Sequence, residues 1–168
     1  MFSRGSKMLS ENLQNKVNEQ IKEELKSAYL YLAMSAYCEA QSFNGFAHWL
    51  NEQAKEELEH ALKLYNHLLE RGNRVEFKTL EAPAKDFGSI QELFEQVLAH
   101  EKYITSLIKD LYEVAKEEKD YPLEIVLQWF ITEQVEEEDS ALYIVDMLKL
   151  IDNKPQGLLM LDRELAKR

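Results

Sequence analysis

Side chains of the types that bind metals stand near the centre of four long segments of this chain. They are Glu24, the pair Glu57 and His60, Glu101, and the pair Gln134 and Glu137. Each stands within an apolar stripe. Burying a carboxylate costs several kcal/mol unless it is paired or binds a cation, so carboxylates gathered in one core predict a bound metal. Oxygen ligands with one imidazole suit iron, manganese or a similar divalent ion, and the thiolates of structural zinc sites are missing.

The spacing within each pair matters for this chemistry. Glu57 and His60 are three residues apart, so on a helix both project to the same side and can hold one ion. Four carboxylates balance the charge of two divalent cations if at least one of them bridges the ions. The alternative is that Glu57 and His60 form an ordinary surface pair on a charged helix, which the other buried carboxylates argue against.

The segments that must position these side chains contain no glycine and no proline. They are residues 6–44, 46–71, 89–121 and 123–154. Good helix formers fill them, and apolar residues recur at steps of three and four, which is typical of amphipathic helices. Ser89 with Glu92 predicts a capping box at the start of the third helix, and Gly72 predicts the end of the second. We expect no β-strand.

The connections between the segments predict the topology. Short turns near residues 42–45 and 119–122 make two antiparallel hairpins. The linker 72–88, about 17 residues long, can reach ~55 Å, whereas a helix of about 27 residues is ~40 Å long. It can therefore cross the bundle and leave the second and third helices parallel. With a small fifth helix at 157–167, we expect an all-α antiparallel four-helix bundle with one long crossover and a short C-terminal helix.

The heights of the polar side chains agree with this topology. In an antiparallel hairpin, facing residues are equidistant from the turn. The position of Glu24 and the midpoint of Glu57 and His60 average to about residue 41, close to the first turn. Glu101 and the midpoint of 134 and 137 average to about residue 118, close to the second. At ~1.5 Å per residue, each hairpin therefore places its polar set at one level of the core.

Bulk composition narrows the class of protein. A length of 168 residues with 45% hydrophobic residues predicts a single domain over 8–168. Residues 1–7 are expected to be a disordered extension or a cloning remnant. The net charge of −11 argues against nucleic acid as a partner. The single cysteine, Cys38, excludes an internal disulfide framework and favours a reducing, cytoplasmic location. No apolar run approaches the roughly 20 residues that span a bilayer, and the first residues lack the apolar stretch of a secretory signal, so we expect neither a membrane span nor a signal peptide.

Four segments carry a resemblance to a known family. NEQIKEELKSAYLYLAM, FAHWLNEQAKEELEHALKLYNHL, AHEKYI and LQWFITEQVEEE closely resemble prokaryotic non-haem ferritin. The resemblance covers essentially the whole chain after Met8. It implies a first iron site of Glu24, Glu57 and His60, a second of Glu57, Glu101 and Glu137 with Gln134 beside it, and a third of Glu56, Glu133, Glu136 and Glu137. It also implies that Tyr31 and Trp129, next to the centre, are electron donors.

The resemblance implies an activity as well. Fe²⁺ binds in pairs, O₂ or hydrogen peroxide takes the electrons, and ferric oxide mineral collects inside a homo-oligomeric shell of 24 subunits built from dimers. Haem is not expected, because bacterioferritins carry a haem-ligating methionine where this chain has Leu58, and a second Glu-x-x-His where it has Gln134 and Glu137.

Two other functions stay open at this point. One is a rubrerythrin-like di-iron oxidase or peroxidase, although many of its members carry a Cys-rich segment and this chain has one cysteine. The other is a metal-free helical bundle that acts as an interaction module. Some of these residues also have a purely structural alternative. Glu133 and Glu136 belong to an acidic run that could simply be solvated, while Tyr31 and Trp129 could serve packing alone.

Overall fold

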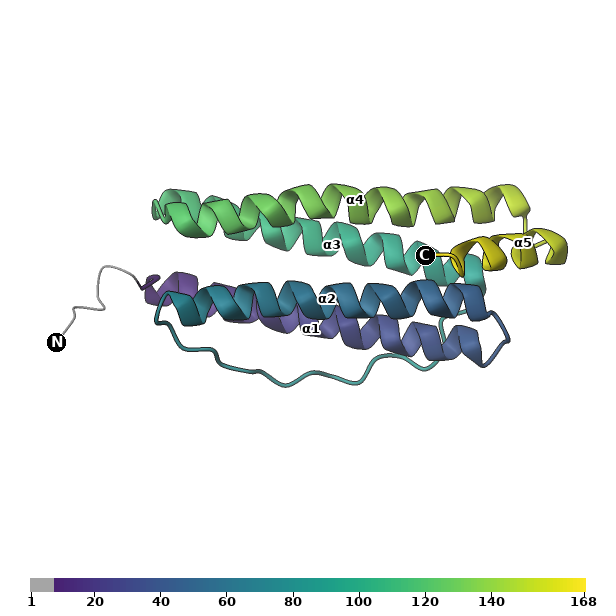
Figure 1. The fold of residues 1–168 in the computed structure, drawn as a ribbon, viewed down its shortest axis with the longest axis horizontal. Helices are drawn as coiled ribbons and strands as arrows, with labels where there is room; N and C mark the ends of the chain where they lie inside the picture. Colours follow the sequence, from purple (N-terminus) through teal and green to yellow (C-terminus); the bar gives the residue numbers. More distant parts are fainter. Residues whose placement is uncertain (1–7) are drawn as a thin grey trace.

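A computed structural model describes residues 8–168, and they form five α-helices with no β-strand among them. The expectation for residues 1–7 lies outside the described residues. The helices are α1 (Glu11–Glu39), α2 (Asn44–Glu70), α3 (Ile90–Glu117), α4 (Tyr121–Ile151) and α5 (Pro155–Leu165). Figure 1 shows the first four as a long bundle, with α5 at the end where α4 finishes.

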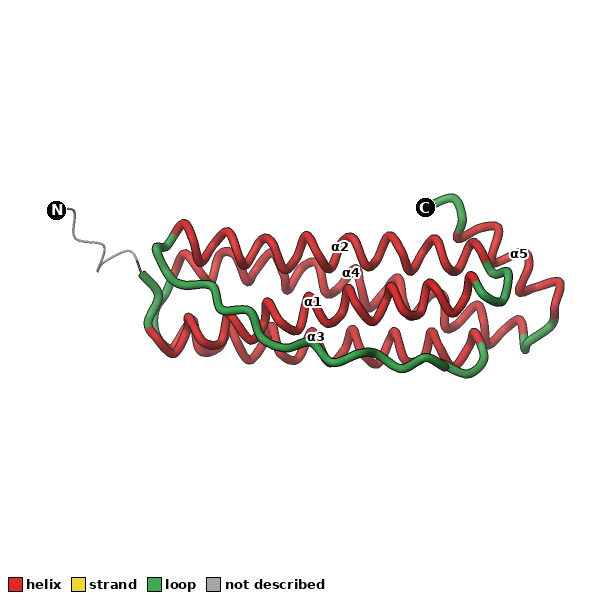
Figure 2. The backbone as a smooth tube through the Cα atoms, turned by 90° about the horizontal axis from the view of Figure 1, so that it is seen from below, coloured by secondary structure: helices red, strands yellow, loops and turns green. Residues whose placement is uncertain are grey.

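The topology is the predicted one. α1 and α2 form one antiparallel hairpin, and α3 and α4 form the other (Figure 1). The segment between α2 and α3 runs as an extended loop along the length of the bundle, so that α2 and α3 point the same way (Figure 2). The expectation of an all-α bundle with one long crossover and a short fifth helix is confirmed.

Local signals set most helix ends. The capping box of Ser89 and Glu92 is present. Gly72, with φ +80°, ends α2 through hydrogen bonds from Gly72 N to Leu69 O and from Asn73 N to Leu68 O, a Schellman motif.

Several boundaries differ from the stretches between glycines and prolines. α1 ends at Glu39, and α2 begins at Asn44 and includes Gly45. α1 begins at Glu11, because the Ser10 side chain caps it. α4 and α5 include Pro122 and Pro155 in their first turns, where the missing N–H has no helical partner to lose.

The crossover is fastened to α1 by a buried asparagine. The Asn18 side chain donates to Arg74 O at 3.0 Å and accepts from Glu76 N at 2.9 Å. Farther along, the Tyr37 hydroxyl donates to Gly88 O. Backbone groups of an extended segment that lacks a neighbouring strand need such partners, since an unpaired buried group is costly.

The apolar core is divided into two clusters along the bundle. On every long helix, a buried glutamate stands between a residue of one cluster and a residue of the other. On α1, for example, Glu24 lies between Ile21 of one cluster and Tyr31 of the other. On α4, Glu137 separates Phe130 from Ala141 in the same way. The polar level predicted from the sequence is thus a layer with hydrophobic packing on both sides.

Helix α5 docks on the start of α2. The Asp162 carboxylate accepts hydrogen bonds from Gly45 N and Phe46 N, both at 2.9 Å. A Cβ atom on Gly45 would stand 1.6 Å from Asp162 O, so only glycine permits this approach. Leu161 and Leu165 are buried in the adjoining hydrophobic cluster and complete the contact.

Candidate metal centre

The structure brings all six predicted core side chains together in the polar layer. Glu24, Glu57 and Glu101 are 0% exposed, and the other three are at most 5% exposed: Gln134, His60 and Glu137. They come from α1, α2, α3 and α4, one or two from each. The four helices were expected to deliver them to one level, and they do so.

Glu24, Glu57 and His60 form one half of this cluster. One ligand atom from each lies within 4.8 Å of the others, close enough for a shared metal ion. His60 Nδ1 lies 3.2 Å from Glu57 Oε2. Gln20 Nε2 donates to Glu24 Oε1 at 2.8 Å and holds that carboxylate in place.

Glu101 is held by two other side chains. The Tyr31 hydroxyl donates to Glu101 Oε1, and Gln134 Nε2 donates to Glu101 Oε2 at 3.1 Å. The Gln134 amide also lies 3.2 Å from Thr105 Oγ1. Because the nitrogen of Gln134 points at Glu101, this residue orients a carboxylate. The glutamate that a second Glu-x-x-His unit would have at this position carries no N–H and could not donate in this way.

Glu137 has an amide partner that the sequence-based site does not include. Gln53 Nε2 donates to Glu137 Oε2 at 2.6 Å, and Gln53 is fully buried. Gln53 stands in the core stripe of α2, one turn before Glu57, and Gln20 precedes Glu24 by the same interval. An amide four residues before Glu24 and another four residues before Glu57 are the signal that could have found both.

The concentration of buried carboxylates raises their pKa values. Burial, and then the neighbouring Glu57, raise the pKa of Glu24 well above its ordinary value. Burial and the charge of Glu101 do the same for Glu57 and raise the pKa of Glu137 to about 7. Burial also raises the pKa of Glu101. Without a cation, the cluster therefore holds protons at pH values where exposed glutamates are ionised.

Several acceptor atoms of the cluster receive no hydrogen bond from the described residues. They are Glu24 Oε2, Glu57 Oε1 and Gln53 Oε1, all buried. A buried acceptor without a partner costs about 1–3 kcal/mol. A divalent cation would satisfy the two carboxylate oxygens and replace the protons, so the donor set fits a metal centre.

A second, more open group adjoins the core cluster. One ligand atom each from His60, Glu133 and Glu137 lie within 4.8 Å of one another. Glu56 and Glu133 line a depression of about 300 Å³ that reaches His60. Glu136 is exposed and lines a different depression, beside Lys102. Of the predicted third site, the described structure thus groups Glu133 and Glu137 closely, with Glu56 beside them and Glu136 farther out.

Aromatic side chains border the centre on two sides. Tyr31 is fully buried, and burial with the charge of Glu101 raises its pKa well above the ordinary value. Trp129 is partly exposed and packs edge-on against His60, with ring centroids 5.5 Å apart. Lys63 Nζ lies 4.2 Å from the centroid of the Trp129 ring. Both aromatics lie next to the cluster.

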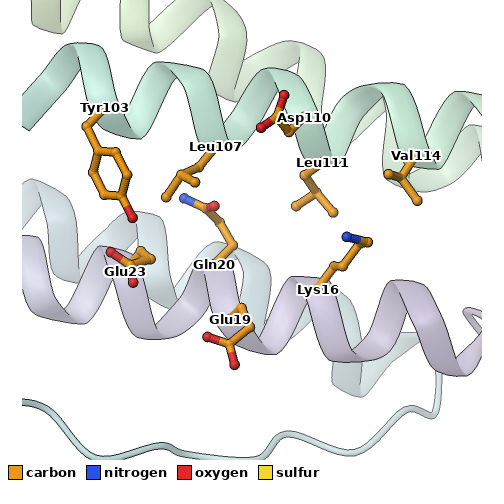
Figure 3. Close-up of a pocket in the computed structure, with 9 residues that line it drawn as sticks. All are labelled: Lys16, Glu19, Gln20, Glu23, Tyr103, Leu107, Asp110, Leu111 and Val114. Carbon is orange, nitrogen blue, oxygen red and sulfur yellow. The ribbon is translucent and has the colours of Figure 1, made fainter.

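The opposite side of the bundle has its own polar depression, between α1 and α3. Figure 3 shows Glu23 of α1 facing Tyr103 of α3 across it and Gln20 facing Leu107, with Asp110 farther along α3. Its volume is about 350 Å³. Gln20 belongs to both places, since it lines this depression and holds Glu24.

Comparison with known proteins decides the family. The sequence profile described as Ferritin-like domain matches residues 14–151. The bacterial non-heme ferritin of Staphylococcus aureus (strain USA300) is 40% identical over 161 residues, which cover 96% of this chain and 97% of that protein. The chain belongs to the ferritin family. The bacterial non-heme ferritin of Staphylococcus epidermidis, at 41% identity over the same shares, agrees with this assignment.

Solved ferritins share the fold of this family member. An open-pore ferritin from the archaeon Archaeoglobus fulgidus superposes with a TM-score of 0.94 at 43% identity, covering 95% of this chain and 98% of that one. A form of the same ferritin engineered to be closed gives 0.93. Within residues 8–168, none of the helices combines the length and apolarity needed to cross a membrane.

Proposed function

We propose that this ferritin-family protein stores iron and acts as a ferroxidase, oxidising Fe²⁺ at the core cluster. The observation that supports the proposal best is the set of four glutamates buried in one layer, two of which have oxygens without a hydrogen-bond donor among the described residues. In a core that served packing alone, such a cluster would only lower stability, because burying carboxylates without a partner is costly. Membership in the ferritin family supports iron as the cargo.

Each side chain has a role in this proposal. Glu24 and His60 hold one Fe²⁺, Glu101 and Glu137 hold the second, and Glu57 bridges them. Hard carboxylates favour the higher charge of Fe³⁺, so they assist electron loss to O₂ or hydrogen peroxide. Gln20, Gln53 and Gln134 fix the carboxylates by hydrogen bonds. Such supporting contacts typically matter about 10–100-fold in metal affinity or activity.

The residues around the two irons complete the proposal. Tyr31, hydrogen-bonded to Glu101, supplies a further electron in this proposal, and Trp129, packed against His60, is a second candidate donor. Glu56, Glu133, Glu136 and Glu137 hold a third iron on its way to a ferric oxide mineral. The mineral lies inside a shell of 24 copies built from dimers. The buried free thiol of Cys38 is compatible with a reducing cytoplasm, and no haem is involved.

An anaerobic titration followed by air tests the activity. We expect two Fe²⁺ per chain to bind tightly, and ferric absorbance to appear when oxygen is admitted. Glu57→Gln should abolish tight binding of both ions, since Glu57 is shared, while Glu124→Gln, far from the layer on α4, should not. Failure of the unmodified protein to bind two ions would favour a metal-free bundle.

Particle mass in solution tests the storage part. A hollow shell of 24 copies has a mass far above that of any dimer. A dimer that still oxidises Fe²⁺ would instead favour a rubrerythrin-like oxidase or peroxidase.

A further inference from the structure

Arg168 makes an ion pair with Glu56. Glu56, Glu133 and Glu137 form the more open group beside the core cluster, called the outer group below. Arg168 Nη2 lies 2.6 Å from Glu56 Oε2. The side chains of Arg168 and Glu56 are 28% and 41% exposed, so the pair is partly shielded from water. Glu56 lines the depression that reaches His60 and Glu133. The pair therefore links the region after α5 to the rim of the metal centre.

Three further contacts fix Arg168 on α2. Its guanidinium lies over the Trp49 ring, 4.7 Å from the ring centroid. Its Nη1 donates to Trp49 O at 3.4 Å, and its own carbonyl lies 2.9 Å from His48 Nε2. Upstream, Asp162 binds the start of α2 through Gly45 and Phe46. The fold thus delivers the guanidinium to Glu56, since both backbone and side chain of Arg168 are held.

The position of Glu56 makes this pairing consequential. A carboxylate that accepts from a guanidinium has less negative charge to offer a cation, and the guanidinium adds a positive charge that repels one. Glu56 is also close enough to the core that its charge adds to the effects of burial and of Glu101 on the pKa of Glu137. Arg168 is therefore set to influence ions at the outer group more than those in the core.

We propose that Arg168 competes with a cation for the Glu56 carboxylate, so that an ion binding at the outer group of Glu56, Glu133 and Glu137 must displace this arginine. Arg168 is a positioning residue, because it acts through Glu56. This inference rests on the proposed function, in which the outer group takes an iron after the two core sites. The competition predicts that the ion at the outer group binds more weakly than it would to the same carboxylates without Arg168.

Calorimetric titration with Co²⁺, which air does not readily oxidise, tests the inference. Arg168→Gln should tighten the third Co²⁺ by about fivefold, the loss of one partly exposed ion pair, and leave the first two unchanged. Arg163→Gln, the same charge change at an exposed position on α5, is the matched control and should leave the third ion unchanged. Unchanged or weaker binding of the third ion in Arg168→Gln would overturn the inference.

Further variants separate competition from a structural role. In a Glu56→Gln background, Arg168→Gln should give no gain, because the shared carboxylate is gone; an undiminished gain would overturn the proposal. If Arg168→Gln disturbs α5, seen by particle mass and circular dichroism, Arg168→Lys takes its place. That variant keeps the charge without the planar fork and should tighten the third ion about twofold, whereas no tightening would contradict the proposal.

The same titration distinguishes two kinds of failure. If the unmodified protein binds no Co²⁺ in the core, the proposed function fails together with the inference. If two ions bind tightly and the third does not respond to Arg168, only the competition is wrong.

Discussion

Replacing Glu137 by glutamine should stabilise the metal-free protein while weakening its response to metal. Glu137 is buried beside Glu101, and burial followed by that charge raises its pKa from 4.5 to about 7. A group whose pKa is higher in the folded state contributes fully below its unfolded value, here 4.5, and its contribution is lost as the pH rises through about 7. Glutamine has no proton to lose, so it avoids this loss. Its carbonyl can still accept from Gln53.

The size of the effect follows from the two pKa values. At 1.36 kcal/mol per pH unit, the raised pKa of Glu137 lowers the free energy of unfolding, relative to its value below pH 4.5, by about 2 kcal/mol at pH 6 and about 3 kcal/mol at pH 8. The loss arises because the carboxyl ionises at lower pH in the unfolded chain than in the fold. Glu137→Gln should recover most of this, with a larger gain at pH 8 than at pH 6. Saturating Co²⁺ should reverse the order of stability, because it stabilises the unmodified protein by mass action and binds the variant poorly.

Urea unfolding of chelator-treated protein at the two pH values measures these differences. Asp139→Asn, an exposed acid-to-amide change on the same helix, is the control and should shift stability by less than about 0.5 kcal/mol. The reasoning is refuted if metal-free Glu137→Gln is less stable than the unmodified protein at pH 8. A gain that is the same at both pH values would refute it equally, because then charge is not the cause.

Three other substitutions test contacts outside the centre. Burial raises the pKa of Asp120, but the bidentate ion pair with Arg71 and a backbone hydrogen bond outweigh it and lower the pKa; Asp120→Asn should therefore cost about 1–2 kcal/mol at pH 7 in urea unfolding. That cost should shrink as the pH falls below 3.8, where the unfolded carboxyl is protonated, and a constant cost would contradict the ion pair. Gly45→Ala places a methyl group 1.6 Å from Asp162 O, so limited proteolysis should cut α5 faster, and an unchanged rate would show that α5 docks otherwise. Asn18→Ala should speed hydrogen exchange in the crossover at residue 76 while leaving α4 unchanged; equal rates there would mean that the side chain does not hold the crossover.

The level of the candidate metal centre could be predicted from sequence, because each residue of a helix adds a constant rise along its axis. Glu24, Glu57 and Glu101 each interrupt an apolar stripe, and the short turns fix which residues face each other. The reach of the long linker 72–88 allows it to cross the bundle, which indicated the direction of the second hairpin. These inferences need only the rise per residue and the desolvation of charge.

Other parts of the centre depend on tertiary contacts that no local pattern encodes. Gln20 and Gln53 stand in core stripes, but their roles appear only when each amide meets a particular carboxylate oxygen. The pairing of Arg168 with Glu56 spans 112 positions and depends on how α5 docks. Likewise, Asn18 holds the crossover only because that segment lies against α1, which the local sequence does not indicate.

The location of iron in crystals is the most direct test of the central claim, that cations replace protons in the buried carboxylate layer. Crystals soaked with Fe²⁺ without oxygen should show two anomalous peaks at the iron absorption edge, one beside Glu24 and His60 and one beside Glu101 and Glu137, with Glu57 between them. Anomalous peaks confined to surface carboxylates, with the core layer empty at saturating iron, would contradict the account.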